Sequence, residues 1–336
     1  MTISNKAVPE QGRPVLRRRS ITVDPQLLGL LVALALLLVA GGLLAPGQFF
    51  KPVNLISIGE GITLIGLTAL AAAVVMILGG LDISIGSLVG FCSAAAGVMM
   101  MQVDSVWAGL GAALVVGVVC GMINGVIITK GKLDPVIVTL ATYSAFRGLA
   151  LLTTGNGYAV NVRNVWFNRI STTTFAGLPI PVIILIVAVV VFVFLMGYTT
   201  IGRNVYAIGG NPNAARLAGI NLDRYKLFVY TLSGFMAGLA AILLTARTKS
   251  GQPISGSEGL EMQAITAAIL GGVSNRGGKG AIIGAILGVL IIGVLNNIMI
   301  LMSVPTFYQR IARGLLLIIA ALIMNWSLFA PKKRAV

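Results

Sequence analysis

Apolar runs and short polar segments alternate along the whole chain, and most of the runs are long enough to cross a lipid bilayer. About 20 consecutive apolar residues suffice for one helical crossing. The alternation therefore predicts an all-α membrane protein, a polytopic bundle of about ten transmembrane helices. We place the crossings at residues 27–45, 53–78, 84–101, 106–129, 135–154, 179–198, 227–246, 259–273, 280–304 and 305–329.

The predicted crossings form one transmembrane domain, residues 26–329, between an N-terminal tail, residues 1–25, and a C-terminal tail, residues 330–336. The longest internal hydrophilic loop covers residues 199–226. An even number of crossings puts both tails on the same side. That side carries 16 of the 24 Lys and Arg residues and the other side five, so the positive-inside rule identifies it as cytoplasmic. We therefore expect both termini in the cytoplasm.

Composition and charge exclude several other classes of protein. Apolar residues make up 57% of the chain, charged residues 10%, and the mean hydropathy is +0.98. Soluble domains contain about 25% charged residues, so the chain is expected to lie in lipid. Its net charge of +15 is spread in short clusters between apolar runs, which argues against a nucleic-acid partner. With no histidine and only Cys92 and Cys120, we expect no metal or haem cofactor.

One stretch, Ile77 to Ser87, places polar residues between two apolar runs. A carboxylate at membrane depth is costly and normally faces protein or a water-filled cavity, so Asp82 marks a candidate transport site. Two adjacent glycines precede it, and Asp82 and Ser84 are suited to cap a new helix beginning near Ile85. A broken helix with a polar cap is a recurring way to build a transport site. The alternative is an ordinary short loop between two helices.

Other polar side chains also lie inside the predicted crossings. An uncharged solute such as a sugar needs donors and acceptors between apolar walls. We predict a solute pathway lined by Asp82, Ser84, Ser87, Asn124, Gln263 and Asn296. Arg147 lies within the fifth crossing and needs a partner there, for which Asp82 and Glu60 are candidates. Snorkelling of its side chain to the interface is the alternative.

Glycines recur every four residues in two of the crossings. They are Gly117, Gly121 and Gly125 in the fourth, and Gly280, Gly284 and Gly288 in the ninth. Such ridges of small residues predict close packing against another helix in lipid.

The loop at 199–226 carries a complete helix-capping pattern. Asn211 is a favourable N-cap, Pro212 a favourable first-turn residue, and Gly219 sits where a C-terminal cap belongs. The predicted helix has about two turns and is marginal alone, so it must rest on another surface. That surface is either the bilayer, the underside of this chain, or a groove on a partner protein.

No nucleotide-binding loop accompanies these features. Gly271 to Gly280 contains Gly-Gly-Lys-Gly, but a phosphate-binding loop needs Gly-x-x-x-x-Gly-Lys followed by Ser or Thr. Val273 occupies the position of the first glycine, and Gly280 follows the lysine. The sequence thus predicts that any ATP is bound by another chain.

Four segments carry a family resemblance: Gly79–Ser87, Ile201–Asn211, Ala214–Ile220 and Leu270–Gly280. Through them, residues 50–328 resemble the permease subunits of bacterial ABC sugar importers of the ribose, xylose and arabinose type. The resemblance implies a multi-pass permease of the inner membrane that is not itself an enzyme. It implies three partners: a cytoplasmic ABC ATPase, a periplasmic sugar-binding protein, and a second permease copy or a paralogue.

The resemblance also implies a role for the short loop helix. It would be the coupling helix that enters a groove of the ATPase. The residues concerned are Asn211, Pro212, Asn213, Ala214, Ala215, Arg216, Leu217 and Gly219.

Import of a monosaccharide, a pentose such as ribose, is the function that these features favour. Other solutes carried by more distant relatives are autoinducer-2, nucleosides and branched-chain amino acids. A secondary transporter coupled to protons or sodium is the main alternative of a different class. It would use Asp82, Glu60 and Arg147 as its titrating or ion-binding groups, and it would not need a coupling helix.

Overall fold

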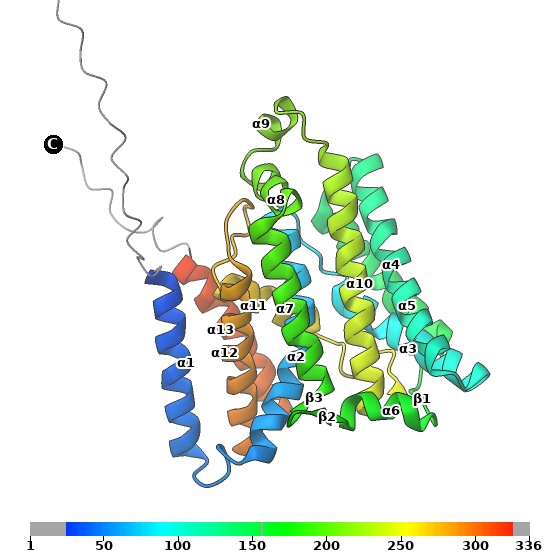
Figure 1. The fold of residues 1–336 in the computed structure, drawn as a ribbon, viewed down its shortest axis with the longest axis vertical. Coiled ribbons are helices and arrows are strands. Elements are labelled where there is room, and N and C mark those ends of the chain that lie inside the picture. The colour runs from blue at the N-terminus through cyan, green and yellow to red at the C-terminus, as the bar shows by residue number, and fades with distance from the viewer. Residues whose placement is uncertain (1–24, 156, 325–336) are drawn as a thin grey trace, which may run out of the picture.

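The computed structural model describes residues 25–155 and 157–324, which form a bundle of helices (Figure 1). The helices are α1 (Pro25–Leu44), α2 (Pro52–Ile77), α3 (Ile85–Val103), α4 (Val106–Lys130), α5 (Pro135–Thr153), α6 (Val165–Thr172), α7 (Ile180–Tyr198), α8 (Thr200–Gly210), α9 (Pro212–Leu217), α10 (Leu222–Thr248), α11 (Leu260–Leu270), α12 (Ile282–Leu301) and α13 (Thr306–Met324). Four two-residue strands form two antiparallel pairs, β1 (Val160–Asn161) with β4 (Ser250–Gly251) and β2 (Thr174–Phe175) with β3 (Leu178–Pro179). The all-α prediction is confirmed.

A helix lies at each of the ten predicted crossings, but two of these helices differ from the prediction. Within the described ranges, eight helices are long and apolar enough to cross a membrane. The crossing at 259–273 contains only the 11-residue α11, too short to span about 30 Å of hydrocarbon. α13 is not among the eight and carries Arg310 and Arg313. The predicted tails, Pro25 apart, and the end of the tenth crossing lie outside the described residues.

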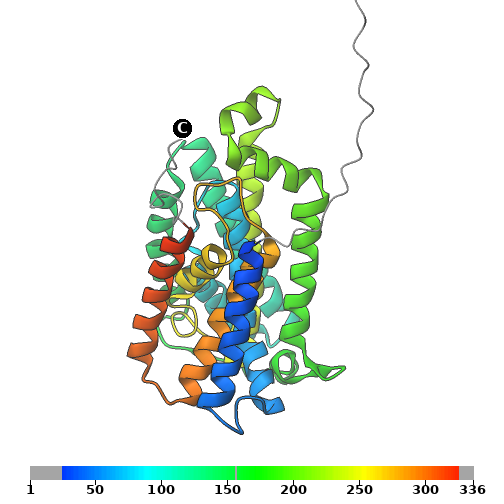
Figure 2. The same cartoon turned by 90° about the vertical axis from the view of Figure 1, so that its left-hand side faces the viewer.

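The second helix, α2, is the centre of the bundle. Every residue from Ile62 to Ile77 is buried. α10 and α3, with α4 and α5 beyond them, lie on one side of α2, and α11 and α12 on the other. α1 packs on α12 and α13 on α11, along the flank that Figure 2 faces.

The predicted glycine ridges pack against other helices, except that Gly280 lies in the loop before α12, against Val273, and is not part of a helix. A Cβ at Gly117 would overlap the carbonyl oxygen of Gly234 in α10, and one at Gly121 would overlap that of Tyr230. On α12, Gly284 lies in the same way against the backbone of Gly271 at the end of α11. Because only glycine lets two helix backbones approach this closely, the ridges fix the pairs α4–α10 and α11–α12.

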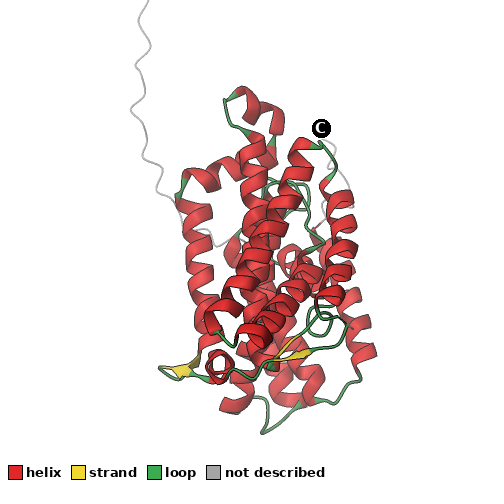
Figure 3. Ribbon diagram, turned by 90° about the vertical axis from the view of Figure 1, so that its right-hand side faces the viewer, coloured by secondary structure: helices red, strands yellow, loops and turns green. Residues whose placement is uncertain are grey.

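The two ends of the bundle are built differently. α8, α9 and the loop before α12 lie at one end, where the N–H of Gly278 donates to the carbonyl oxygen of Ile77 over 2.8 Å. The strands and α6 lie at the opposite end (Figure 3). β1 pairs with β4 there and ties the loop before α6 to the segment that follows α10.

The segment that leads from α10 to α11 follows the length of α3. Gly251 lies against Gly97, the carbonyl oxygen of Pro253 against Gly90, and the carbonyl oxygen of Ser257 against Gly86. Gly86 and Gly97 are about 16 Å apart along the helix axis. The eighth crossing is therefore a broken one, with a non-helical half at residues 249–259 and a helical half, α11.

Candidate functional site

Asp82 lies in the turn between α2 and α3 and is 3% exposed. Its Oδ1 accepts a hydrogen bond from the backbone N–H of Ser84 (3.0 Å) and another from the Ser84 hydroxyl (2.6 Å). Its Oδ2 accepts from the hydroxyl of Ser233 on α10 (2.6 Å). A buried carboxylate is tolerated when its oxygens are hydrogen-bonded in this way. Both oxygens of Asp82 are thus satisfied by uncharged groups.

Two further residues complete the Asp82 cluster, which we define as Asp82, Ser84, Ser87, Asn124 and Ser233. The amide nitrogen of Asn124 donates to the Ser84 hydroxyl (2.9 Å), and the Ser87 hydroxyl donates to the Ser84 carbonyl oxygen (2.8 Å). All of these side chains are buried. The structure thus brings four of the six predicted pathway residues together, and adds Ser233.

The start of α3 at Ile85 agrees with the sequence prediction, but the capping differs in detail. The Ser84 side chain makes no capping hydrogen bond to α3, and its hydroxyl oxygen accepts from the Asn124 amide instead. Ser233 was missed altogether. A serine inside the apolar run of α10 gives no local signal that it contacts a turn far away in the sequence.

The other two predicted pathway residues, Gln263 and Asn296, lie apart from the Asp82 cluster, on α11 and α12. The amide nitrogen of Asn296 points to the Gln263 side-chain oxygen at 3.4 Å. The Asn296 side-chain oxygen is buried and has no hydrogen-bond partner among the described residues.

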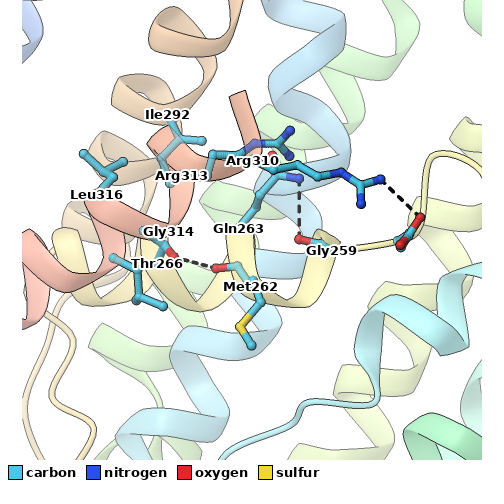
Figure 4. Close-up of a pocket in the computed structure, with 11 residues that line it drawn as sticks. Gly259, Met262, Gln263, Thr266, Ile292, Arg310, Arg313, Gly314 and Leu316 are labelled. Carbon is cyan, nitrogen blue, oxygen red and sulfur yellow. Dashed lines mark hydrogen bonds and ion pairs between the residues drawn. The ribbon is translucent and has the colours of Figure 1, made fainter. Parts of the chain in front are cut away.

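Gln263 lines a cavity of about 310 Å³ between α11, α12 and α13 (Figure 4). The walls combine polar and apolar side chains, among them Met262, Gln263, Thr266, Ile292, Arg310 and Arg313. Arg310 forms an ion pair with Glu258 over 3.5 Å, and both side chains are more than half exposed. A cavity of this size, with a few polar groups on apolar walls, is suited to a small solute.

Arg147 does not pair with either of the predicted partners. Its Nη1 donates to the carbonyl oxygen of Pro253 (2.6 Å) and to the hydroxyl of Ser257 (2.9 Å). Within the described ranges, the salt-bridge partners are Arg310 and Glu258 alone. Neither predicted candidate, Asp82 or Glu60, is therefore the partner of Arg147. The guanidinium instead donates to the non-helical half of the eighth crossing.

The predicted loop helix is present as α9. The Asn211 side chain accepts from the N–H of Ala214 (3.0 Å), Pro212 is the first residue, and Gly219 has a φ of +81°. Ala215 is buried against the chain, whereas Arg216 is exposed and Leu217 is 90% exposed.

A second helix in the same loop, α8, was not predicted. Its Val205 and Ile208 are buried, and Gly209 lies against the carbonyl oxygen of Ile77. α8 therefore rests on the turn that precedes Asp82 and connects α9 to it. Glycines at 202, 209 and 210 concealed the helical pattern of this segment, because glycine is a poor helix former.

Comparison with known proteins gives a consistent result. Residues 55–321 match the model of the family described as the permease component of branched-chain amino acid transport systems. The ribose import permease of Bacillus subtilis (strain 168) is 41% identical over 304 residues, which is 89% of this chain and 92% of that protein.

Two further relatives agree. The L-arabinose ABC transporter permease of Azospirillum brasilense is 38% identical, with 82% of this chain and 80% of that protein covered. The ribose import permease of Escherichia coli (strain K12) is 37% identical, with 88% and 92% covered. No solved structure matches the chain. This chain is therefore a multi-pass inner-membrane protein that belongs to the family of ABC importer permeases.

Proposed function

We propose that this chain is the membrane permease of an ABC importer and carries a pentose such as ribose into the cytoplasm. The observation that supports this most strongly is the similarity to ribose and arabinose permeases, 34–41% identical over most of the chain. ATP would be bound and hydrolysed by a separate subunit, and we expect no cofactor in this chain.

The cavity between α11, α12 and α13 is our candidate for the surface that the solute meets. Gln263 and Thr266 supply donors and acceptors, Asn296 lies behind Gln263, and Ile292 and Leu316 supply apolar wall. A pentose carries no charge and needs this combination. We place Asp82, Ser84, Ser87 and Asn124 behind the pathway, as the support that holds the start of α3.

A second permease copy would cover the open side of this cavity. Glu258 and Arg310 are more than half exposed, and residues 254–256 of the non-helical segment are also exposed. Exposed backbone and charge at membrane depth are not tolerated against lipid, but they are tolerated against protein or water. We therefore propose that this face meets the corresponding face of the second copy or paralogue.

α9 is our candidate for the contact with the ATPase. Six residues form a helix about 9 Å long, small enough for a cleft on a partner. Its exposed Leu217 would supply apolar contact and Arg216 a charge, while Ala215 anchors it to this chain. Placing α9 in the cytoplasm, with both termini, puts the end with α6 and the strands on the side of the sugar-binding protein.

Reconstituted transport tests the solute. The permease, its ATPase and its binding protein are placed in proteoliposomes, and uptake of labelled ribose is measured with and without ATP. We expect ATP-dependent uptake that arabinose or xylose reduces and leucine does not. Uptake of leucine in place of ribose would assign the amino-acid alternative. Uptake by the permease alone, driven by a proton or sodium gradient, would assign a secondary transporter.

Arg216→Glu tests the coupling assignment. The substitution should weaken ATPase association and abolish solute-stimulated ATP hydrolysis, with membrane insertion unchanged because Arg216 is exposed. Thr173→Glu, an exposed residue at the opposite end, is the control for ATPase association, which it should leave unchanged. A photo-crosslinker at position 213 or 217 should form adducts with the ATPase. Adducts only with lipid or with this chain, together with normal transport by Arg216→Glu, would remove α9 from the coupling role.

A further inference from the structure

The non-helical segment at residues 249–259 lies on a face of α3 that is made of small residues. Gly86, Gly90, Ser93 and Gly97 form this face, and a Cβ at any of the three glycines would overlap or crowd the segment or the side chains that hold it. The Ser93 hydroxyl also accepts from the N–H of Gln252 (2.9 Å). Small residues explain how the segment fits, but they do not explain what holds it there.

Arg147 holds the middle of the segment. From α5, its Nη1 donates both to the Pro253 carbonyl oxygen (2.6 Å) and to the Ser257 hydroxyl (2.9 Å). Its Nη2 is buried and has no hydrogen-bond partner in the described part of the chain. A guanidinium inside the bundle is costly unless its charge is balanced, and these partners are both uncharged.

Glu261 stands at the end of the same segment, in the first turn of α11. It is 6% exposed, and its Oε2 is buried without a hydrogen-bond partner within residues 25–155 and 157–324. Oε2 lies against Gly86, and Arg147 Nη1 lies against Gly90, one turn further along α3. Burial disfavours the charged form of the Glu261 carboxyl, whereas backbone hydrogen bonds and the nearby Arg147 guanidinium favour it.

We propose that Arg147 and Glu261 are positioning residues, a pair of opposite charges inside the bundle that locks the segment 249–259 onto α3 and thereby fixes α11. Glu261 is buried and Arg147 is half-buried, so either charge alone would be poorly compensated. Ser257 accepts a hydrogen bond from Arg147 and lies against the same face of α3. Gly86 and Gly90 leave the room that the carboxylate and the guanidinium occupy.

The pair acts on the cavity through α11. Met262, Gln263 and Thr266 follow Glu261 directly and line the cavity, so a displacement of Glu261 displaces that wall. The consequence for transport rests on the proposed function, whereas the pairing of Arg147 with Glu261 does not.

A double-mutant cycle tests the pair. Arg147→Gln, Glu261→Gln and the double variant are made in a background in which the two native cysteines, both buried, are replaced by alanine. Each carries Ala264→Cys, a buried position on α11, or, as the matched control, Ala237→Cys, a buried position on α10. The rate of thiol labelling in detergent then reports how often each helix opens.

Each single variant should raise labelling at position 264 by about tenfold or more and leave position 237 unchanged, because it strands one buried charge. The double variant should label more slowly at 264 than either single variant, since no charge is left unpaired. Arg147→Lys keeps the positive charge but loses the branched guanidinium, so it should raise labelling at position 264 by about threefold or less.

Three outcomes would overturn the proposal. The first is no change in Glu261→Gln, which would mean that the carboxylate is not a charged partner. The second is a double variant whose effect equals the product of the two single effects, which would mean no coupling. The third is equal opening at positions 264 and 237, which would mean general loss of stability. Because the labelling needs neither solute nor ATPase, these outcomes leave the proposed function untouched.

Discussion

Asp82 and Glu261 are both buried carboxylates beside a break in a helix, yet their surroundings differ. Asp82 accepts three hydrogen bonds, two from Ser84 and one from Ser233, and both of its oxygens are used. Glu261 leaves Oε2 without a hydrogen bond in the described structure and lies near the guanidinium of Arg147. Neutral donors satisfy both oxygens of Asp82, whereas Glu261 has neutral backbone donors and, in the proposed pair, a nearby charge.

The difference indicates different mechanical roles. Hydrogen bonds are short and directional, so the Asp82 cluster defines one conformation of the turn before α3. Attraction between charges falls slowly with distance and tolerates small displacements. The Asp82 cluster thus fixes the turn beneath α8, and the proposed Arg147–Glu261 pair keeps the segment beside the cavity attached to α3 through small displacements.

The largest effect should follow the loss of the Asp82 carboxylate. Asp82→Ala leaves the Ser84 N–H and two buried hydroxyls without their acceptor, so we expect a loss of about 3 kcal/mol or more in stability, and no transport. Asp82→Asn keeps an oxygen for Ser84 and should retain part of both. Thermal unfolding in detergent and ribose uptake measure the two effects.

Membrane insertion is the control for Asp82→Ala and Asp82→Asn, because both proteins should still insert into the membrane. Equal and severe loss in Asp82→Ala and Asp82→Asn would show that the negative charge itself is required. Asp82, like Glu261, would then act through its charge, and an ion-coupled mechanism would be favoured. Normal transport by Asp82→Ala would reduce the turn to an ordinary loop.

A smaller effect is expected from Gly86→Ala, which bears on Glu261. The new Cβ would overlap Oε2 and lie 3.0 Å from the Ser257 carbonyl oxygen, so the carboxylate and the segment must move. We expect a loss of up to about 3 kcal/mol in unfolding free energy. Gly111→Ala on α4, with nothing within 4 Å of its Cβ, is the control and should be neutral or stabilising. If the two variants unfold alike, Glu261 is not held where the structure places it.

The sequence predicted local features. The glycines and polar residues before Ile85 predicted a turn and the start of α3, although not the hydrogen bond between Asp82 and Ser84. Asn211 and Pro212 predicted α9 for the same reason, because capping depends on neighbours in the chain. Glycine ridges predicted close helix pairs, although not that the first would meet Gly234.

Contacts between distant segments could not be predicted in this way. Ser233 reaches Asp82, and Arg147 reaches Pro253, only after α10 and α5 have packed. Hydropathy also could not distinguish the buried α2 from the peripheral α1, because lipid and a protein interior are similarly apolar. The broken eighth crossing was hidden for the same reason, since its non-helical half lies in a groove that α3 provides.

Ser233→Ala tests the comparison directly, because it would leave one oxygen of Asp82 without its hydrogen-bond donor, as Oε2 of Glu261 already is in the described structure. Oδ2 of Asp82 would lose the only hydroxyl that donates to it in the described structure. Hydrogen bonds to charged groups contribute about 1.5 kcal/mol or more, so we expect a loss near that value in thermal unfolding experiments. Thr231→Ala, two residues earlier on α10, should cost less, because among the described residues its hydroxyl bonds only to the carbonyl oxygen of Leu227. Equal costs would mean that Ser233 does not stabilise the carboxylate.

The smallest effect on stability should come from the ion pair at the cavity. Glu258 and Arg310 are 52% and 61% exposed, and their oxygen–nitrogen distance is 3.5 Å. In water such a pair contributes about 0–1 kcal/mol, so Glu258→Gln should leave thermal unfolding almost unchanged, in contrast to Glu261→Gln three residues further on.

This expectation depends on whether water, protein or lipid covers the exposed face. If lipid covered it, removal of Glu258 would strand Arg310 in hydrocarbon, and the cost would approach that of a buried charge. Unfolding of Glu258→Gln at low and high salt separates the two cases, because only a pair in water is screened. A large, salt-independent loss would contradict a pair in water and would mean that lipid or another protein covers this face in the sample.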